Sequence, residues 1–167
     1  ILGWLAGKTS PNQIPLITGL ENLKPSPDDL KSLCAAFGTT SGAPMLHILG
    51  HTPESNLPAA SEAPLHIIKI ENIIQAWHEL NLGETSIDLV AIGSPHASFE
   101  EVKKINSFLL NRKCHSNTTM IITVGRQTLA LLKQANIYRS LIRSGVQVIP
   151  DICWCSITEP IFPTEAR

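Results

Sequence analysis

Short apolar runs that alternate with helical patterns dominate the chain from residue 45 onward. The runs cover residues 45–50, 65–70, 87–93, 118–125 and 146–150, and helical patterns occupy 71–83, 98–112 and 126–145. The run 87–93, "IDLVAIG", lacks polar alternation, which is typical of a strand buried on both faces of a parallel sheet. Two strands followed by helix–strand repeats predict an α/β fold, with a mostly parallel sheet flanked by helices and right-handed crossovers.

Residues 1–42 differ from the rest and predict a lead-in of helix and loop that belongs to a larger upstream region. Residues 43–167 then form the predicted α/β domain. The chain opens in what is expected to be a helix, and proline and glycine punctuate a loop with one short strand up to residue 26. Ser26 and Pro27 are typical of the first positions of a helix.

Two of the helical patterns predict which side chains face a core. In the helix that follows Ser26, the expected apolar face holds Leu30, Leu33, Cys34 and Phe37. In the helix at 71–83, the expected inner face holds Ile73, Ile74, Trp77 and Leu80, and Gly83 is placed to end the helix.

The composition indicates a globular chain and excludes two classes of partner. Hydrophobic residues make up 43% and charged residues 16% of the 167 residues, as in ordinary folded domains. The formal net charge of −1 gives no basic footprint for nucleic acid. No apolar run approaches the roughly 20 residues that cross a bilayer. We expect neither a nucleic-acid partner nor a membrane span.

The four cysteines favour a reducing compartment, and we expect the cytoplasm. Cys34, Cys114, Cys153 and Cys155 lack the spacing of a secreted disulfide framework. Free thiols, or thiolates on a metal, are therefore expected. A pair with one residue between the cysteines is a weak metal pattern, because zinc sites usually leave two or more. The chain starts without methionine, and we expect both ends to be cut from a longer chain.

Polar and reactive side chains follow several of the predicted strands. They lie in Gly50-His51-Thr52-Pro53-Glu54, Gly93-Ser94-Pro95-His96, Gly125-Arg126-Gln127-Thr128 and Asp151-Ile152-Cys153-Trp154-Cys155. Open α/β sheets bind ligands beyond the carboxyl ends of their strands, so we expect these side chains at one rim. Each also has an ordinary structural interpretation: Ser94 can start a turn, His96 can be a hydrogen-bonding loop residue, Arg126 can be a surface arginine and Asp151 can cap a turn.

Common catalytic motifs are absent from the sequence. It contains no phosphate-binding glycine loop and no Gly-x-Ser-x-Gly elbow. The segment "HILGH" has no glutamate after its first histidine and is predicted to be a strand, so it is not a zinc-protease motif. The sequence therefore disfavours nucleotide binding, serine hydrolysis and zinc proteolysis. A soft-metal site that uses Cys153 remains open.

Three long segments resemble a known family. "SGAPMLHILGHTPES", "DLVAIGSPHASFEEVKKI" and "DICWCSITEPIFP" together resemble aconitase X, the divergent branch of the aconitase superfamily. The opening segments "LGWLAGK", "IPLITGLE" and "PSPDDLKSLCAAFGTTSGA" resemble the same family, so the resemblance runs in order over nearly the whole chain. It implies an aconitase-like α/β domain that is part of a catalytic region.

The resemblance implies a hydro-lyase assisted by an iron–sulfur cluster. The Ser-Pro-His tip, with "DICWC" and "EPIFP", looks most like the bacterial single-polypeptide branch, whose members are similar to cis-3-hydroxy-L-proline dehydratases. Their product is pyrroline-2-carboxylate. The archaeal branch, which dehydrates mevalonate 5-phosphate, tends to have cysteine where this chain has Ser94, and its reaction is the alternative.

Carried onto this chain, the resemblance makes Cys153 a thiolate ligand of the cluster, of unknown nuclearity, and places Ser94 beside cluster and substrate. Ser94, His96 and Arg126 are the candidate catalytic residues. Thr52, Glu54, Ser94 and Arg126 are the candidate substrate-binding residues, with Arg126 suited to clamp a carboxylate. We interpret Cys155 as a neighbour of the cluster and Cys114 as a loop thiol.

The resemblance also implies that the chain holds only part of the site. Its partners would be a small hydroxy acid and either the rest of a parent chain or a small swivelling domain or subunit, and little activity is expected of the isolated chain. Two other classes stay open: a non-catalytic α/β module, and a metal-free domain that binds small anions through Arg126 and strand-end amides.

Overall fold

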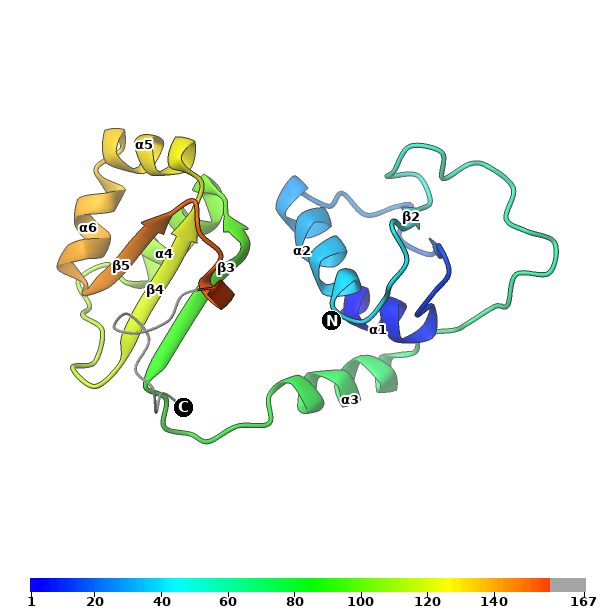
Figure 1. Cartoon of the computed structure of the whole chain (residues 1–167), viewed down its shortest axis with the longest axis horizontal. Helices are drawn as coiled ribbons and strands as arrows, with labels where there is room; N and C mark the ends of the chain where they lie inside the picture. The colour runs from blue at the N-terminus through cyan, green and yellow to red at the C-terminus, as the bar shows by residue number, and fades with distance from the viewer. Residues whose placement is uncertain (157–167) are drawn as a thin grey trace. The chain divides into compact units, whose positions relative to one another are not determined.

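The computed structural model describes residues 1–156 and divides into two compact units, 1–82 and 83 onward (Figure 1). The division falls between Leu82 and Gly83, later than the expected boundary after residue 42. The difference arises because the strand near residue 47 pairs within the first unit and not with the sheet of the second.

The first unit joins three helices to a small parallel ladder. Its helices are α1 (Leu2–Thr9), α2 (Pro27–Gly38) and α3 (Ile70–Leu80), and its strands are β1 (Leu16–Ile17) and β2 (His47–Ile48). The strands pair in parallel, with Leu16 opposite His47. Ala6, Phe37, Leu46 and Ile48 form the buried core. Gly3 lies so close to the backbone of Leu33 that a larger side chain would clash with it, which lets α1 pack tightly on α2.

Three expectations for the first unit are wrong. Residues 65–69 form no strand, and Leu65 and Ile67 are 84% and 70% exposed. Cys34 is exposed, because α2 turns Phe37, with Leu30 and Leu33, toward the core. In α3 the buried residue is Ala76, whereas Ile74, Trp77 and Leu80 are exposed. Ile73 is half-buried.

The second unit is an α/β layer, as the alternation predicts. Strands β3 (Leu89–Ala97), β4 (Thr119–Val124) and β5 (Val146–Pro150) form a parallel sheet in the order β3-β4-β5. Helix α4 (Phe99–Phe108) connects the first two strands, and α5 (Arg126–Gln134) and α6 (Ile137–Arg143) connect the last two (Figure 1). The predicted α/β class with a mostly parallel sheet is thus confirmed.

The core of the second unit lies between the sheet and its helices. Met120, Ile122 and Val124 of β4 pack with Val102 of α4, and the same cluster includes Leu132 of α5 and Leu141 of α6. Ile121 and Thr123, which alternate with them along β4, are also fully buried. The central strand is therefore covered on both faces. The sequence had predicted this for residues 87–93 instead, but these lie in the edge strand β3, and residues 89–92 are only half-buried.

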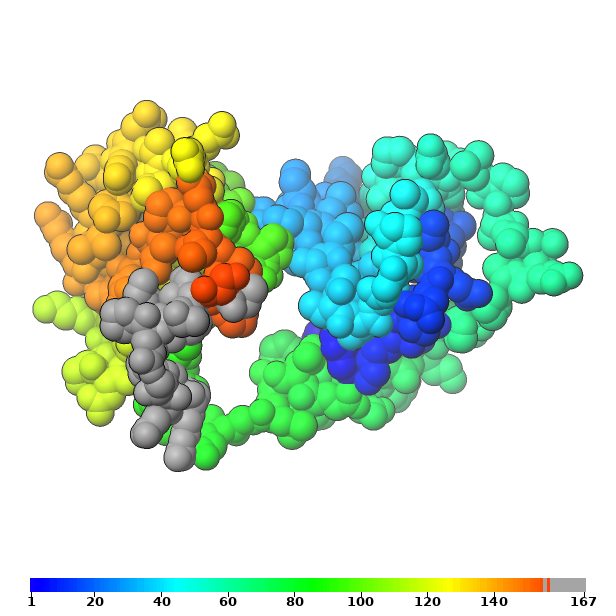
Figure 2. Space-filling model, viewed as in Figure 1, coloured from blue at the N-terminus to red at the C-terminus, as the bar shows by residue number. Residues whose placement is uncertain are grey.

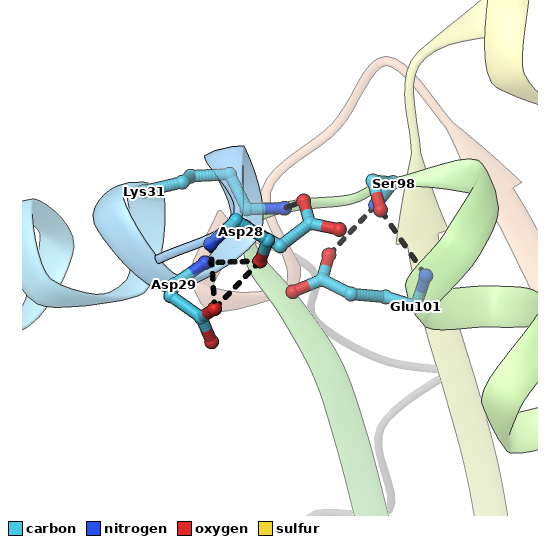
Figure 3. A network of polar contacts seen from close by, with 6 residues as sticks. Asp28, Asp29, Lys31, Ser98 and Glu101 are labelled. Atoms are coloured by element: carbon cyan, nitrogen blue, oxygen red, sulfur yellow. Dashed lines mark hydrogen bonds and ion pairs between the residues drawn. The ribbon is translucent and has the colours of Figure 1, made fainter. Parts of the chain in front are cut away.

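A reciprocal cap fixes the start of α4, directly after β3. The Glu101 backbone N–H donates to Ser98 Oγ over 3.1 Å, and the Ser98 backbone N–H donates to a Glu101 carboxylate oxygen over 2.8 Å (Figure 3). This is a capping box, formed by the Ser-x-x-Glu spacing of residues 98–101, and it satisfies two N–H groups that the helix itself leaves unpaired. It marks the residue at which the strand ends.

Strand β3 does not end at Gly93, as the sequence had suggested. It continues to Ala97, but five steps along β3 from Ile92 to Ala97 match only two along β4 from Ile122 to Val124. The extra residues form an irregular bulge that carries Ser94, Pro95 and His96. After β5, the chain reaches a single 3₁₀ turn, η1 (Trp154–Ser156), which contacts β3 and β4. Within residues 1–156, no helix is long and apolar enough to span a membrane.

Candidate functional site

The bulge in β3 is possible because Gly93 lies against β4. Its φ of 116° is in a region that only glycine adopts without strain. A Cβ there would collide with the backbone oxygen and the hydroxyl of Thr123. The Thr123 hydroxyl donates to the Gly93 carbonyl oxygen over 2.8 Å, in a buried contact. The start of the bulge is thus anchored to β4, and the residue after Gly93, Ser94, is exposed. Bulges of this kind often re-aim a side chain beside an active site.

The segment after β5 meets the bulge through two polar contacts. Cys153 Sγ lies 3.6 Å from Ser94 Oγ, as donor to it. His96 Nε2 lies 3.1 Å from the carbonyl oxygen of Ile152. Because a carbonyl only accepts, Nε2 carries the hydrogen in this contact. Three of the predicted site residues, Ser94, His96 and Cys153, are therefore brought together from two separate strand ends.

Arg126 is held at the end of the neighbouring strand. It is the first residue of α5, directly after Gly125, and its side chain is 81% exposed. The Arg126 backbone N–H donates to one carboxylate oxygen of Asp151 over 2.9 Å, and its Nε donates to the other. These bonds, from the backbone first and then from the side chain, hold the pKa of the Asp151 carboxyl below its ordinary value.

Thr52 and Glu54 belong to the first unit, where each has a local environment of its own. Thr52 Oγ1 accepts from the Ile48 backbone N–H over 2.9 Å, so its hydroxyl closes the turn after β2. Glu54 has a left-handed backbone, with φ 64°. It lines an open cavity of about 480 Å³ with His47, Leu57 and Pro58. Figure 2 shows this opening between the loop of residues 54–69 and the rest of the unit. A substrate-binding role for Thr52 and Glu54 stays a prediction.

Among the described residues, few side chains that bind soft metals lie at this end of the sheet. Among those residues no group of three or more histidine, cysteine or acidic side chains could hold a metal ion. Cys153 is the cysteine at the site, whereas Cys34 lies on α2 and Cys114 contacts Met120. The side chain of Cys155 lies outside the described residues. A single thiolate does not fit an iron–sulfur cluster by itself, because clusters usually take four ligands.

Two contacts of the site were not anticipated from the sequence, the pairing of Asp151 with Arg126 and the bond of Thr123 to Gly93. A signal for the first was present. Both Gly125-Arg126 and Asp151 directly follow strands, and adjacent parallel strands bring such positions to the same edge. No signal in a single sequence marks Thr123, which is one of several β-branched residues in an apolar strand.

Comparison with known proteins assigns both units. Residues 1–78 match the aconitase X second domain, and residues 87–167 match the aconitase X third domain. Cis-3-hydroxy-L-proline dehydratases of Hypocrea jecorina and Pseudomonas aeruginosa are 36% and 39% identical, over 100% and 99% of this chain. The phosphomevalonate dehydratase large subunit of Methanocaldococcus jannaschii is 32% identical over 91% of it and is covered over 38% of its own length.

A solved structure agrees with the fold. The crystal structure of Thermococcus kodakaraensis aconitase X (holo-form) matches 91% of this chain with a TM-score of 0.80 and 30% identity, and the match covers 39% of that chain. This chain spans only 29% and 30% of the length of the two hydroxyproline dehydratases. With both units matched in order and these identities across nearly its full length, the chain belongs to the aconitase X family and carries its second and third domains.

Proposed function

We propose that this chain is part of a dehydratase that eliminates water from cis-3-hydroxy-L-proline to give pyrroline-2-carboxylate. The observation that carries the proposal is the cluster of Ser94, His96 and Cys153 at the β3 bulge, beside β4, the strand that leads into Arg126. The two hydroxyproline dehydratases, which are more similar to the chain than the phosphomevalonate dehydratase subunit is, support this choice of substrate.

The reaction requires a carboxylate clamp and two proton transfers. A base removes the hydrogen on C2, and the electron pair of that bond forms the double bond to C3 as the C3–O bond breaks and the hydroxyl leaves with a proton as water. The resulting enamine tautomerises to pyrroline-2-carboxylate. We assign the clamp to Arg126, because a guanidinium matches a carboxylate in a planar, two-bond geometry. Thr52 and Glu54 are proposed as further substrate contacts.

Ser94 and His96 are proposed for the proton transfers. Ser94 Oγ is exposed at the bulge and accepts from the Cys153 thiol over 3.6 Å. A hydroxyl acts as acid or base only where its surroundings activate it, and His96 on the same bulge can supply a second ionisable group. The contact of His96 with the Ile152 carbonyl oxygen orients its ring.

We propose Cys153 as one thiolate ligand of an iron–sulfur cluster, with the remaining ligands outside the described residues. When bound, such a cluster would supply a Lewis acid for the departing hydroxyl. Cys153 Sγ lies 3.6 Å from the Ser94 hydroxyl, which would place the cluster beside this candidate catalytic residue. The rest of a longer chain, or a small swivelling domain or subunit, is proposed to complete the site. The thiols of Cys34 and Cys114, which form no disulfide among the described residues, favour the cytoplasm as its location.

The test uses the complete enzyme that carries these two domains, purified without oxygen and reconstituted with iron and sulfide. Water elimination is measured with cis-3-hydroxy-L-proline and, in parallel, with mevalonate 5-phosphate. We expect turnover of the proline derivative, loss of both iron and turnover in Cys153→Ala, and loss of turnover with iron retained in Ser94→Ala. Cys34→Ala, which removes an exposed thiol on α2, is the matched control.

Each other outcome is informative about one part of the proposal. Turnover of mevalonate 5-phosphate alone would keep the reaction type and replace the substrate. Full iron and activity in Cys153→Ala would remove this residue from the ligand set. The 167-residue chain alone is expected to be inactive, and robust turnover by it would contradict the proposal of a shared site.

A further inference from the structure

Asp151 connects the ends of two neighbouring strands at the candidate site. It follows β5 directly, and Arg126 follows β4 after a single glycine. Both carboxylate oxygens of Asp151 are engaged, one by the backbone N–H of Arg126 and one by its Nε. A carboxylate that accepts from both the backbone and the side chain of one residue fixes where that side chain starts and how it leaves the helix.

The backbone of Asp151 is fixed at the same corner. Its N–H donates to the carbonyl oxygen of Val124 over 2.9 Å, and its φ of 60° lies in the left-handed region. Aspartate and asparagine adopt this region more readily than most residues. The position thus combines a left-handed turn with a carboxylate that bonds across strands, and aspartate satisfies both requirements.

Helix α5 depends on this residue for its first N–H group. Gly125 at the N-cap position has no side chain that could accept a hydrogen bond, so Asp151 supplies the acceptor from another strand. The same ion pair also determines which N–H donors of the Arg126 guanidinium stay available to a ligand. Five N–H donors are present, and Asp151 takes the one on Nε. The four on the two terminal nitrogens are the set that can meet a planar anion with two bonds.

Holding an exposed arginine matters for binding. The Arg126 side chain is 81% exposed, and a long side chain that is free in solvent must be ordered before it can bind, which costs affinity. The ion pair orders it in advance. It also offsets part of the positive charge, so recognition depends more on geometry than on general attraction.

We propose that Asp151 is a positioning residue, which orders Arg126 in advance for the substrate carboxylate and ties it to the turn that carries Cys153. This inference rests on the proposed function only in taking Arg126 as the carboxylate clamp. It goes beyond that function in naming the residue that sets the orientation of the clamp, and in coupling the clamp to the Cys153 segment through one side chain.

The test compares two ring ligands that do not react, pyrrole-2-carboxylate and its neutral amide pyrrole-2-carboxamide. Their dissociation constants are measured by calorimetry on the complete, reconstituted enzyme with Asp151→Asn, Arg126→Ala and the double variant. Asparagine tolerates the left-handed backbone and keeps one acceptor oxygen. Glu100→Gln breaks another exposed ion pair, the one with Lys103 on α4, and is the control.

We expect Asp151→Asn to weaken carboxylate binding about 10-fold to 100-fold, to change carboxamide binding less than about twofold, and to raise KM more than it lowers kcat. In the Arg126→Ala background, Asp151→Asn should have no further effect on either ligand, because the residue acts through Arg126. Iron content should stay at the wild-type level in Asp151→Asn, and Glu100→Gln should behave as wild type throughout.

Equal losses for both ligands, or additive effects in the double variant, would overturn the inference and make Asp151 a purely structural cap. Unchanged carboxylate binding in Asp151→Asn would overturn it as well. Failure of the proposed function looks different, because the wild-type enzyme would then eliminate no water from the proline substrate while the binding cycle could still be measured.

Discussion

The hydroxyl of Thr123 donates to the carbonyl oxygen of Gly93 over 2.8 Å, at the point where β3 leaves its register with β4. Both residues are buried. This single contact joins the central strand to the start of the bulge, so it connects the packing of the sheet with the placement of Ser94 and His96. It makes the geometry of the candidate site depend on two residues that carry no chemistry themselves.

Gly93→Ala should destabilise the second unit by about 3 kcal/mol, through backbone strain and overpacking together. The physical reason is the φ of 116° and the collision of a new Cβ with Thr123. Denaturant unfolding of this chain, followed by hydrogen exchange at β3 and β4, measures the change. Gly83→Ala is the control, since a Cβ there meets nothing. Equal stability of the two variants would contradict the role given to Gly93.

Thr123→Val should cost about 1–3 kcal/mol, although valine has nearly the same shape and favours strands. The substitution leaves the Gly93 carbonyl oxygen without its hydroxyl donor. We expect a lower unfolding midpoint and, in the complete enzyme, lower kcat because the bulge is held less firmly. Thr119→Val, at the partly buried start of the same strand, controls for the change of residue type. A Thr123→Val variant as stable as that control would contradict the prediction.

The sequence predicted the parts of this fold that depend on local pattern. The apolar run of β4, the capping box of Ser98 and Glu101 and the helical stretch before β5 follow from periodicity and cap chemistry. The sequence did not predict the parts of the fold that depend on contacts between distant residues. Residues 65–69 have the composition of a strand but no strand partner in the described part of the chain, and the apolar face of α3 is exposed.

The candidate site shows the same difference between features set by local sequence and features set by contacts between distant residues. Ser94, His96 and Cys153 could be named because they follow predicted strands, and parallel strands bring their ends to one edge. The bulge that places Ser94 could not be foreseen, because it depends on the fit between Gly93 and Thr123. The role of Asp151 required a partner twenty-five positions away in the chain, as its bond to Arg126 spans that separation.

Ser98→Ala should destabilise α4 by about 1 kcal/mol, the usual cost of losing a serine N-cap. It removes the oxygen that accepts from the Glu101 backbone N–H over 3.1 Å. Thermal unfolding of this chain measures the shift. Ser107→Ala, near the far end of the same helix, is the control, because its hydroxyl donates only to the local Lys104 carbonyl oxygen. Equal melting temperatures for the two variants would show that the cap has no energetic role.

The carboxyl of Glu21 should make the stability of the first unit depend on pH. It accepts from the Gly19 backbone N–H over 2.9 Å and from its own N–H, and His51 lies near enough to add a favourable charge. These contacts hold the pKa of Glu21 below its ordinary value of 4.5. The stabilisation is therefore present above pH 4.5 and is lost as the pH falls through the lowered pKa of the folded state. We expect Glu21→Gln to flatten the fall in melting temperature between neutral pH and that acid range. Parallel melting curves for wild type and variant across the range would show that the carboxylate contributes nothing.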